Sequence, residues 1–156
     1  MYLHKKKKGV KINYDDKPYE SWKSRQVGYW RKANAIHKWF VDNVQDGEDD
    51  CGYYVVTQAN LEELRSICDK IIQNTKLVPS GKTYKVFDIN LKKEVDEQQL
   101  VVDDDALCEE LLPTQDGFFF GGTSYDDWYY ESVQYTRDLC DKLLARMTQL
   151  QNKLKN

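Results

Sequence analysis

A chain of 156 residues is the usual size of one domain, and a 40% share of apolar residues is enough for a hydrophobic core. A net charge of −3 argues against binding to nucleic acid through its phosphates, since proteins that do so are usually basic overall. No stretch has the apolar length needed to cross a bilayer, and no apolar run follows the lysines at 5–8 as it would in a secretory signal. The sequence therefore predicts a cytoplasmic protein that does not bind membranes.

The cysteines and histidines predict no metal site. Four cysteines lie far apart and form no Cys-x-x-Cys pair: Cys51, Cys68, Cys108 and Cys140. We expect reduced thiols that pack as small apolar side chains. A zinc site needs closer ligand spacing or more histidine than His4 and His37 supply. The acidic loop at 46–52 lacks the alternating ligands of a calcium-binding loop, so neither a metal nor a cofactor is expected.

In the first half of the chain the apolar spacing predicts two strands and two helices. Alternation at 10–14 allows a short strand. A helix is predicted from Ser24 to Val44, because apolar residues recur there at helical spacing and Gly47 follows as a C-terminal cap. Residues 53–56 are expected to form a strand, after which Thr57 caps a helix over 58–74. The apolar face of that helix consists of Leu61, Leu64, Cys68, Ile71 and Ile72.

The second half predicts a hairpin and two further helices. Residues 83–90 and 98–102 are expected to pair as strands across the charged loop 91–97. Asp103 or Asp104 caps a short helix at 105–112. Ser124 or Asp126 opens a long helix over 125–154, whose apolar residues follow a heptad-like spacing typical of a seam against another helix. The seam consists of Thr136, Cys140, Leu143, Met147, Leu150 and Leu154.

These elements predict an α+β fold in a single domain that spans residues 1–156. Two long helices and the long C-terminal helix are expected to pack with a small, mostly antiparallel sheet. Residues 1–20 are expected to be peripheral to the core. Because the end of the last helix is otherwise polar, residues 145–156 are expected to extend the protein toward a second copy and so to support a homo-oligomer.

The first motif that bears on function is Tyr29–Phe40, which mixes aromatic, polar and basic residues. On the predicted helix, Trp30, Asn34 and His37 fall on one stripe. Asn and His on a largely apolar stripe need hydrogen-bond partners, which are either the protein's own loops or the polar edge of a ligand. Arg31 and Lys32 beside Trp30 would add charge and a stacking face for an anionic aromatic molecule.

The second motif, residues 111–126, places three phenylalanines between glycines just before a predicted helix start. Backbone N–H groups in such a position can hold an anion. The motif is not a P-loop, because no Gly-Lys-Ser/Thr follows, and it is not a Gly-x-Gly-x-x-Gly fingerprint either. The alternative interpretation is a tight structural turn capped by Ser124 or Asp126.

Two strings of sequence carry a resemblance to known proteins. They are WRKANAIHKWF at Trp30–Phe40, and ELLPT at 110–114 leading through GFFFG at 117–121 to Thr123 and Tyr125-Asp126. With these strings the chain resembles, over roughly residues 25–144, a family of small uncharacterised proteins from bacteriophages and bacterial prophages. The resemblance brings no established activity, and it implies an accessory phage protein expressed in the host bacterial cytoplasm.

Small phage accessory proteins often counter host defence, and one strategy is to sequester a nucleotide immune signal of the cyclic ADP-ribose or cyclic-dinucleotide type. Such proteins tend to be small homo-oligomers with pockets near the subunit interface. By this analogy we expect a non-catalytic, homo-oligomeric counter-defence protein that binds a nucleotide-derived small molecule. The alternatives are an inhibitor that grips a host defence protein through its aromatic surface, and a small nucleotide hydrolase or phosphodiesterase.

The predicted ligand site joins the two motifs. A nucleotide is recognised by stacking on an aromatic ring, by a few edge contacts, and by cations or helix N–H groups that meet its phosphate. No catalytic residue is predicted, and His37 with Cys51 is the single pair that resembles a base and a nucleophile. The residues expected to converge around one pocket are Trp30, Arg31, Asn34, His37, Phe119, Thr123, Tyr125 and Asp126.

Overall fold

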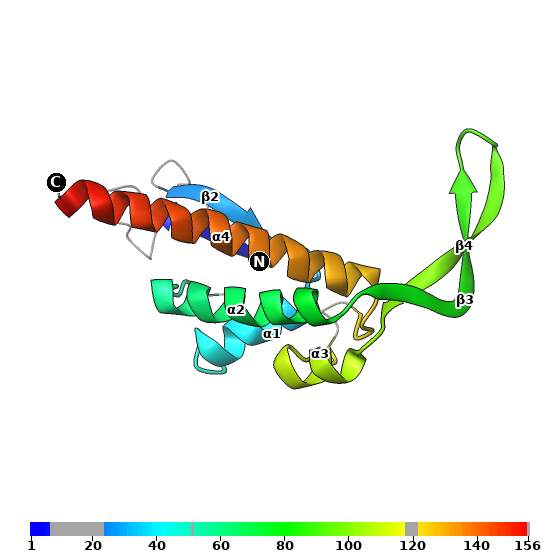
Figure 1. The fold of residues 1–156 in the computed structure, drawn as a ribbon, viewed down its shortest axis with the longest axis horizontal. Coiled ribbons are helices and arrows are strands. Elements are labelled where there is room, and N and C mark those ends of the chain that lie inside the picture. The colour runs from blue at the N-terminus through cyan, green and yellow to red at the C-terminus, as the bar shows by residue number, and fades with distance from the viewer. Residues whose placement is uncertain (7–23, 51, 118–121, 156) are drawn as a thin grey trace.

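The protein is an α+β structure of helices and two small antiparallel sheets, as predicted. The computed structural model describes residues 1–6, 24–50, 52–117 and 122–155 (Figure 1). Within these ranges four helices and four strands follow one another in this order: β1 (Tyr2–Lys6), β2 (Ser24–Tyr29), α1 (Asn34–Asn43), α2 (Gln58–Asn74), β3 (Leu77–Asp88), β4 (Lys93–Val102), α3 (Asp105–Leu111) and α4 (Asp127–Lys155). None of the described helices is both long enough and apolar enough to cross a bilayer.

The body is built on α2 and α4, which pack side by side and antiparallel (Figure 1). Helix α2 begins with a capping box between Thr57 and Asn60, and its predicted apolar face is buried at Leu61, Leu64, Cys68 and Ile71. Three contacts fix the direction, because residues later in α2 meet residues earlier in α4. They are Gln58 with Gln151 at 3.0 Å, Arg65 with Asp141 at 2.7 Å, and Asp69 with Arg137 at 3.6 Å.

The heptad-like seam of the last helix meets α2 of the same chain. Thr136 and Cys140 are buried, and Leu143 and Met147 are partly buried against the core. The contact between Gln151 and Gln58 shows that α2 accompanies α4 nearly to its end. An intramolecular partner therefore accounts for the seam up to Met147, whereas Leu150 and Leu154 are 46% and 79% exposed.

The prediction of one helix from Ser24 to Val44 is wrong for its first half. Residues 24–29 form β2, which pairs antiparallel with β1 in a register that places Leu3 opposite Gly28. An ideal Cβ at Gly28 would lie 2.5 Å from Cδ2 of Leu139, so a larger residue at this position would force the Leu139 side chain of α4 to move. Lys32 then adopts a left-handed backbone with φ 51°, which separates β2 from α1.

Two predicted strands have other outcomes. Residues 53–56 are exposed or half-buried and belong to no strand, because no described segment pairs with them. The apolar run at 53–56 therefore misled the prediction. The predicted strand at 10–14 lies outside the described residues. The ends of the second and third helices, by contrast, match the predictions to within one residue.

Strands β3 and β4 form the predicted hairpin, which is longer than expected and is joined by residues 89–92. We call β3, β4 and the residues between them the arm. Figure 1 shows the arm leaving the helical body at the end opposite the C-terminus of α4. Its base is fixed by hydrogen bonds from Val102 N to Tyr125 O and from Asp103 N to Lys76 O, at 2.9 and 3.0 Å.

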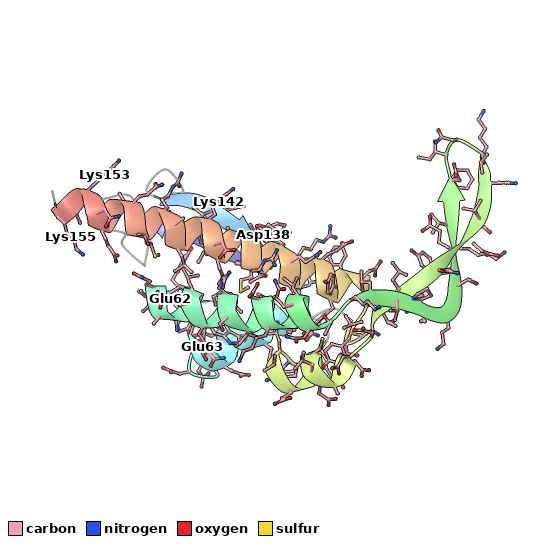
Figure 2. The ribbon with its side chains drawn as sticks, viewed as in Figure 1. Glu62, Glu63, Asp138, Lys142, Lys153 and Lys155 are labelled. Carbon is pink, nitrogen blue, oxygen red and sulfur yellow. The ribbon has the colours of Figure 1, made fainter. Side chains whose placement is uncertain are left out.

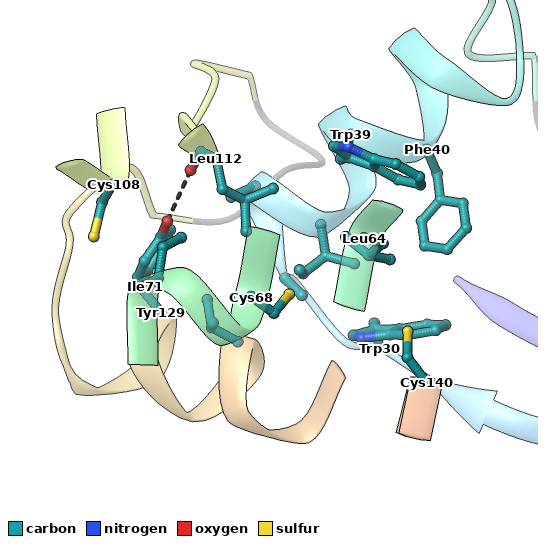
Figure 3. Packing of buried hydrophobic residues seen from close by; sticks show 14 of the residues in the cluster. Trp30, Trp39, Phe40, Leu64, Cys68, Ile71, Cys108, Leu112, Tyr129 and Cys140 are labelled. Atoms are coloured by element: carbon teal, nitrogen blue, oxygen red, sulfur yellow. Dashed lines mark hydrogen bonds between the residues drawn. The ribbon is translucent and has the colours of Figure 1, made fainter. Parts of the chain in front are cut away.

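The hydrophobic core lies between α1, α2, α3 and the first half of α4 (Figure 3). Leu64, Cys68 and Ile71 of α2 are completely buried at its centre. Figure 3 shows the Tyr129 hydroxyl reaching the carbonyl oxygen of Leu112, to which it donates a hydrogen bond of 2.8 Å. This bond fixes the end of α3 against the start of α4.

Candidate functional site

Trp30 is part of the core. It precedes α1, so it does not share a helical stripe with Asn34 and His37, and that prediction is wrong. The indole is buried beside Phe40, with ring centroids 5.7 Å apart. Its Nε1–H donates to Thr136 Oγ1 at 2.8 Å. An indole whose polar group is satisfied inside the protein contributes packing rather than a stacking face for a ligand.

Asn34 connects the two motifs through hydrogen bonds inside the protein. The side chain is buried, and its amide contacts the backbone of Gln115 twice. Asn34 Nδ2 donates to Gln115 O, and Gln115 N donates to Asn34 Oδ1, both at 2.5 Å. The amide thus uses its donor and its acceptor together to hold residues 113–117 against the start of α1.

His37 and Arg31 lie apart from this junction. His37 Nε2 is 3.1 Å from Asp49 Oδ2, so the ring contacts the acidic loop that follows α1. Arg31 is exposed between β2 and α1. Cys51, which the sequence pairs with His37 as a nucleophile with its base, lies outside the described residues.

The second motif is held by its own hydrogen bonds on either side of residues 118–121. Thr114 Oγ1 donates to Thr123 O at 2.9 Å, and Thr114 N donates to the Tyr125 hydroxyl at 3.3 Å. Asp126 caps α4, as predicted, because its Oδ1 accepts from Tyr129 N at 3.0 Å. Phe119, the remaining residue of the predicted site, lies outside the described residues.

A cavity of about 130 Å³ lies where the two motifs meet. Of the predicted site residues, Asn34 and Asp126 line it, whereas Trp30, Arg31, His37, Thr123 and Tyr125 do not. The remaining lining includes Lys32, which the sequence indicated as a source of positive charge but which was not among the residues expected to converge, and also Trp128 and Ser132, which the sequence did not indicate. The full lining consists of Lys32, Ala33, Asn34, Ala35, Ile36, Thr114, Gly122, Ser124, Asp126, Trp128, Tyr129, Ser132 and Val133.

The first turn of α1 forms one wall of this cavity. Its N-cap residue is Ala33, which has no side-chain oxygen to accept from the first-turn N–H groups. Within the described ranges no acceptor contacts the N–H of Ala35 or Ile36. Lys32 is exposed directly before this turn. The free N–H groups of this turn and the ammonium group of Lys32 lie together, so this wall favours a negatively charged ligand.

The opposite wall is formed by the start of α4 and has a different character. Trp128 is 54% exposed, so its indole offers a free aromatic surface at the mouth of the cavity. Asp126 carries a negative charge next to it, with Oδ1 already bound by Tyr129 N–H. The cavity therefore combines a cationic wall, an aromatic rim and one carboxylate.

The described side chains offer no activated nucleophile near the cavity. Burial raises the pKa of the Cys108 thiol to about 11 and that of the Cys140 thiol to about 12, and it raises the pKa of Cys68 further. High thiol pKa values disfavour the thiolate, which is the reactive form. In the described part of the chain, no group of three His, Cys, Asp or Glu side chains could hold a metal ion.

Comparison with known proteins gives this cavity no counterpart. No family model, no curated protein and no solved structure matches the chain. The resemblance to phage proteins therefore stays a prediction, and the geometry of the cavity carries the functional argument.

Proposed function

We propose that this protein is a non-catalytic phage accessory protein that binds and sequesters a nucleotide-derived signal of the cyclic ADP-ribose or cyclic-dinucleotide type in the host cytoplasm. The observation that carries the proposal is the cavity between the two motifs, where Lys32 and the uncapped first turn of α1 face the exposed indole of Trp128. Lys32 and the N–H groups of the first turn of α1 bind a phosphate, and a base stacks on the indole of Trp128.

The size of the cavity limits how much of the ligand enters it. Pockets that enclose a drug-sized molecule usually measure about 300–1,000 Å³, whereas this one measures about 130 Å³. We propose that a phosphate enters beside Lys32, while the attached nucleoside lies across Trp128 at the mouth. A second copy of the chain would enclose the remainder of the ligand.

Asp126 favours a ligand of low charge. Its carboxylate lines the same cavity and repels a densely charged group such as a triphosphate. A phosphodiester or a bridged pyrophosphate carries less charge per phosphate, and its ribose hydroxyls or base amino groups can donate to the free oxygen of Asp126. This balance supports a cyclic or bridged nucleotide over a free triphosphate.

The test is binding measured by calorimetry against cyclic dinucleotides, cyclic ADP-ribose, NAD and ATP. Trp128→Ala should weaken binding by roughly 5- to 150-fold, the equivalent of about 1–3 kcal/mol for one stacked base. Trp128→Phe, which keeps an aromatic face, should retain most of the affinity. Because Trp128 is exposed at the mouth, the melting temperature should change little in either variant.

Lysine variants supply the matched control. Lys32→Ala should weaken binding, whereas Lys38→Ala on the neighbouring helix α1 should not, because Lys38 pairs with Asp42 at 2.6 Å and does not line this cavity. Mass spectrometry of molecules released by heating the freshly purified protein would identify the natural ligand. The proposal fails if no tested nucleotide binds and heating releases none, or if binding is unchanged in both Lys32→Ala and Trp128→Ala.

The second candidate function is inhibition of a host defence protein through an aromatic surface. The exposed aromatic and apolar side chains at residues 53–55 favour it, since Tyr53, Tyr54 and Val55 lie on the surface before α2. Replacing Tyr53 and Val55 together by Ser would separate the two functions. The double variant should still bind the nucleotide. It should lose counter-defence activity in cells only if this surface binds the host protein.

A further inference from the structure

The net charge of −3 is the average of two parts of the chain with opposite charge. Residues 1–38 contain eleven Lys or Arg and three Asp or Glu, whereas residues 39–156 contain twelve Lys or Arg and twenty-three Asp or Glu. The first part therefore has a net charge of +8 and the second part −11. In the described ranges of the first part, residues 1–6 and 24–38, six of the cations are present and no carboxylate side chain. This part attracts anionic partners that the rest of the chain repels.

Five of these six cations lie in β1, in β2 or directly after β2. One face of this small sheet lies against the body, because Leu3 packs on the core and its register partner Gly28 faces Leu139 of α4. Side chains alternate along a strand, so the neighbouring residues point to the other face. Tyr2 and Tyr29 are register partners on that outer face, and they are 60% and 43% exposed.

The outer face of the sheet carries adjoining aromatic rings. The ring centroids of Tyr2 and Tyr29 are 4.9 Å apart, and the ring of His4 lies 6.2 Å from that of Tyr2. Tyr135 of α4 extends this surface beyond β2, since its hydroxyl accepts a hydrogen bond of 3.2 Å from Tyr29 N and its side chain is 44% exposed. Gln26, which lies opposite His4 in the register, is exposed as well. We call Tyr2, His4, Tyr29 and Tyr135 the aromatic face.

Two exposed cations adjoin the aromatic face. Arg31 follows Tyr29 by two residues. Figure 2 shows Lys142 on the side of α4 that faces away from α2, and in Figure 1 β2 lies on that same side of α4. Neither Arg31 nor Lys142 forms an ion pair with another described residue. The carboxylate of Asp138, on the same helix, is already paired with Arg137 at 3.1 Å, so it offsets little of this positive charge.

We propose that the aromatic face binds single-stranded nucleic acid, whose bases stack on the tyrosine rings and whose phosphates lie beside the cations. Exposed aromatic rings on a sheet, combined with positive charge, form a platform on which proteins bind single strands. Successive bases stack on Tyr2 and Tyr29, and Arg31 binds a phosphate. This site is separate from the cavity of the proposed function, because no residue of the aromatic face lines that cavity.

The side chains of the aromatic face favour a single strand over other polyanions. An anionic bilayer is bound through apolar side chains that insert below its headgroups, whereas this face consists of three tyrosines and a histidine. A duplex keeps the faces of its bases stacked on one another, so the tyrosine rings would have no base to bind. A single strand presents bases and phosphates together, and it therefore matches both the rings and the cations.

Fluorescence anisotropy with a labelled single strand of about ten nucleotides, within the usual site size, tests the proposal. Tyr2→Ala and Tyr29→Ala should each weaken binding by roughly 5- to 150-fold, the loss of one stacked base. Tyr2→Phe and Tyr29→Phe should retain most of the affinity, and a duplex of the same sequence should bind at least tenfold more weakly. Phe87→Ala on the arm is the matched control, because Phe87 is 60% exposed, like Tyr2, but lies outside the aromatic face. Unchanged affinity in both tyrosine-to-alanine variants, or equal affinity for the duplex, would overturn the proposal.

A salt series tests the contact between Arg31 and a phosphate. For a single strand, the logarithm of the binding constant falls with the logarithm of the salt concentration by about 0.7 for each phosphate that a cation neutralises. Arg31→Ala should reduce that slope by about 0.7, whereas Lys38→Ala should leave it unchanged, because Lys38 is paired with Asp42. The same slope in Arg31→Ala and in the unmodified chain would contradict the proposal.

Photo-cross-linking of the unmodified chain locates the strand without any variant that has to fold. A single strand that carries photoreactive uracil analogues is irradiated with the protein, and mass spectrometry identifies the modified peptides. We expect cross-links in residues 1–6, in residues 24–31 or at Tyr135. Trp128→Ala separates this site from the cavity of the proposed function, since it should weaken binding of the nucleotide signal and leave the affinity for the single strand unchanged. Cross-links at Trp128, or a single strand that no longer binds to Trp128→Ala, would overturn the proposal.

Discussion

Replacing Asn34 by Ala removes the side chain whose hydrogen bonds join the two motifs among the described residues. The change deletes a buried amide together with both hydrogen bonds to the Gln115 backbone. A typical hydrogen bond contributes about 0.5–1.5 kcal/mol net, and leaving a partner unsatisfied in a partly buried place adds to the loss. We therefore expect Asn34→Ala to lower the free energy of unfolding by about 1–3 kcal/mol.

Asn34→Asp separates the two bonds. A carboxylate still accepts from Gln115 N–H, but it sets a negative oxygen against the Gln115 carbonyl oxygen, where the amide now donates. We expect this variant to be destabilised as well at neutral pH. Lys38→Ala is the control on the same helix, because its exposed pair with Asp42 is worth only about 0.3–0.5 kcal/mol.

The assay is urea unfolding followed by circular dichroism, with nucleotide binding measured in parallel on the folded variants. The midpoint should fall for both Asn34 variants while the denaturant slope stays unchanged. An Asn34→Ala protein that unfolds like the unmodified chain but no longer binds a nucleotide would refute the reasoning. That result would mean that the amide serves the ligand and that the Gln115 contact contributes nothing to stability.

Three further predictions concern the core and the acidic loop. Leu64→Ala should lower the free energy of unfolding by about 2–5 kcal/mol in the same assay, since Leu64 is completely buried; a loss near zero would place α2 on the surface. In a Cys51→Ser variant, a thiol reagent at pH 8 should label Cys68, Cys108 and Cys140 only as fast as the protein unfolds, because burial raises their pKa values. The hydrogen bond that Tyr54 donates to Asp50 raises the pKa of Tyr54 to about 12. Its contribution to stability is therefore present below pH 10 and is lost as the pH rises through 12. Burial raises the pKa of Tyr129, and a hydrogen bond with Glu97 raises that of Tyr84, so several tyrosines ionise late; ultraviolet titration should show one fewer of these late tyrosines in Asp50→Asn.

Elements whose signals are local could be predicted closely from the sequence. Helix α2 has its cap, its apolar face and its length within one stretch of chain, so its bounds were predicted correctly. The hairpin likewise depends on neighbouring residues. The helix predicted from Ser24 failed because β2 depends on pairing with β1 and on the approach of Gly28 to Leu139, contacts that lie far apart along the chain. Local propensity yields to such tertiary contacts.

In the candidate site, too, some features could be predicted from the sequence and others depend on contacts between residues far apart in the chain. That the two motifs adjoin was predicted from their composition, and the Asn34–Gln115 hydrogen bonds and the shared cavity place them together. Which side chains reach the cavity could not be predicted. Trp30 was selected for its ring, but Thr136, 106 residues later, binds its N–H in the core. Lys32 was noted as a cation, but its left-handed backbone, which sets where its side chain lies, could not be predicted from the sequence. Trp128 was not selected, because the sequence does not show which side of the last helix stays exposed.

The pairing of α2 with α4 also bears on how the chain is synthesised. Arg65 meets Asp141, and Trp30 meets Thr136, so the core is closed by residues from the last quarter of the chain. While the ribosome is still translating that quarter, Leu61, Leu64 and Ile71 have no α4 to cover them. Contacts this distant in sequence form slowly, and an uncovered apolar helix face is the kind of surface that chaperones bind and that aggregates. Rare codons or stalls placed after residue 75 would therefore reduce the soluble yield more than the same stalls placed before α2.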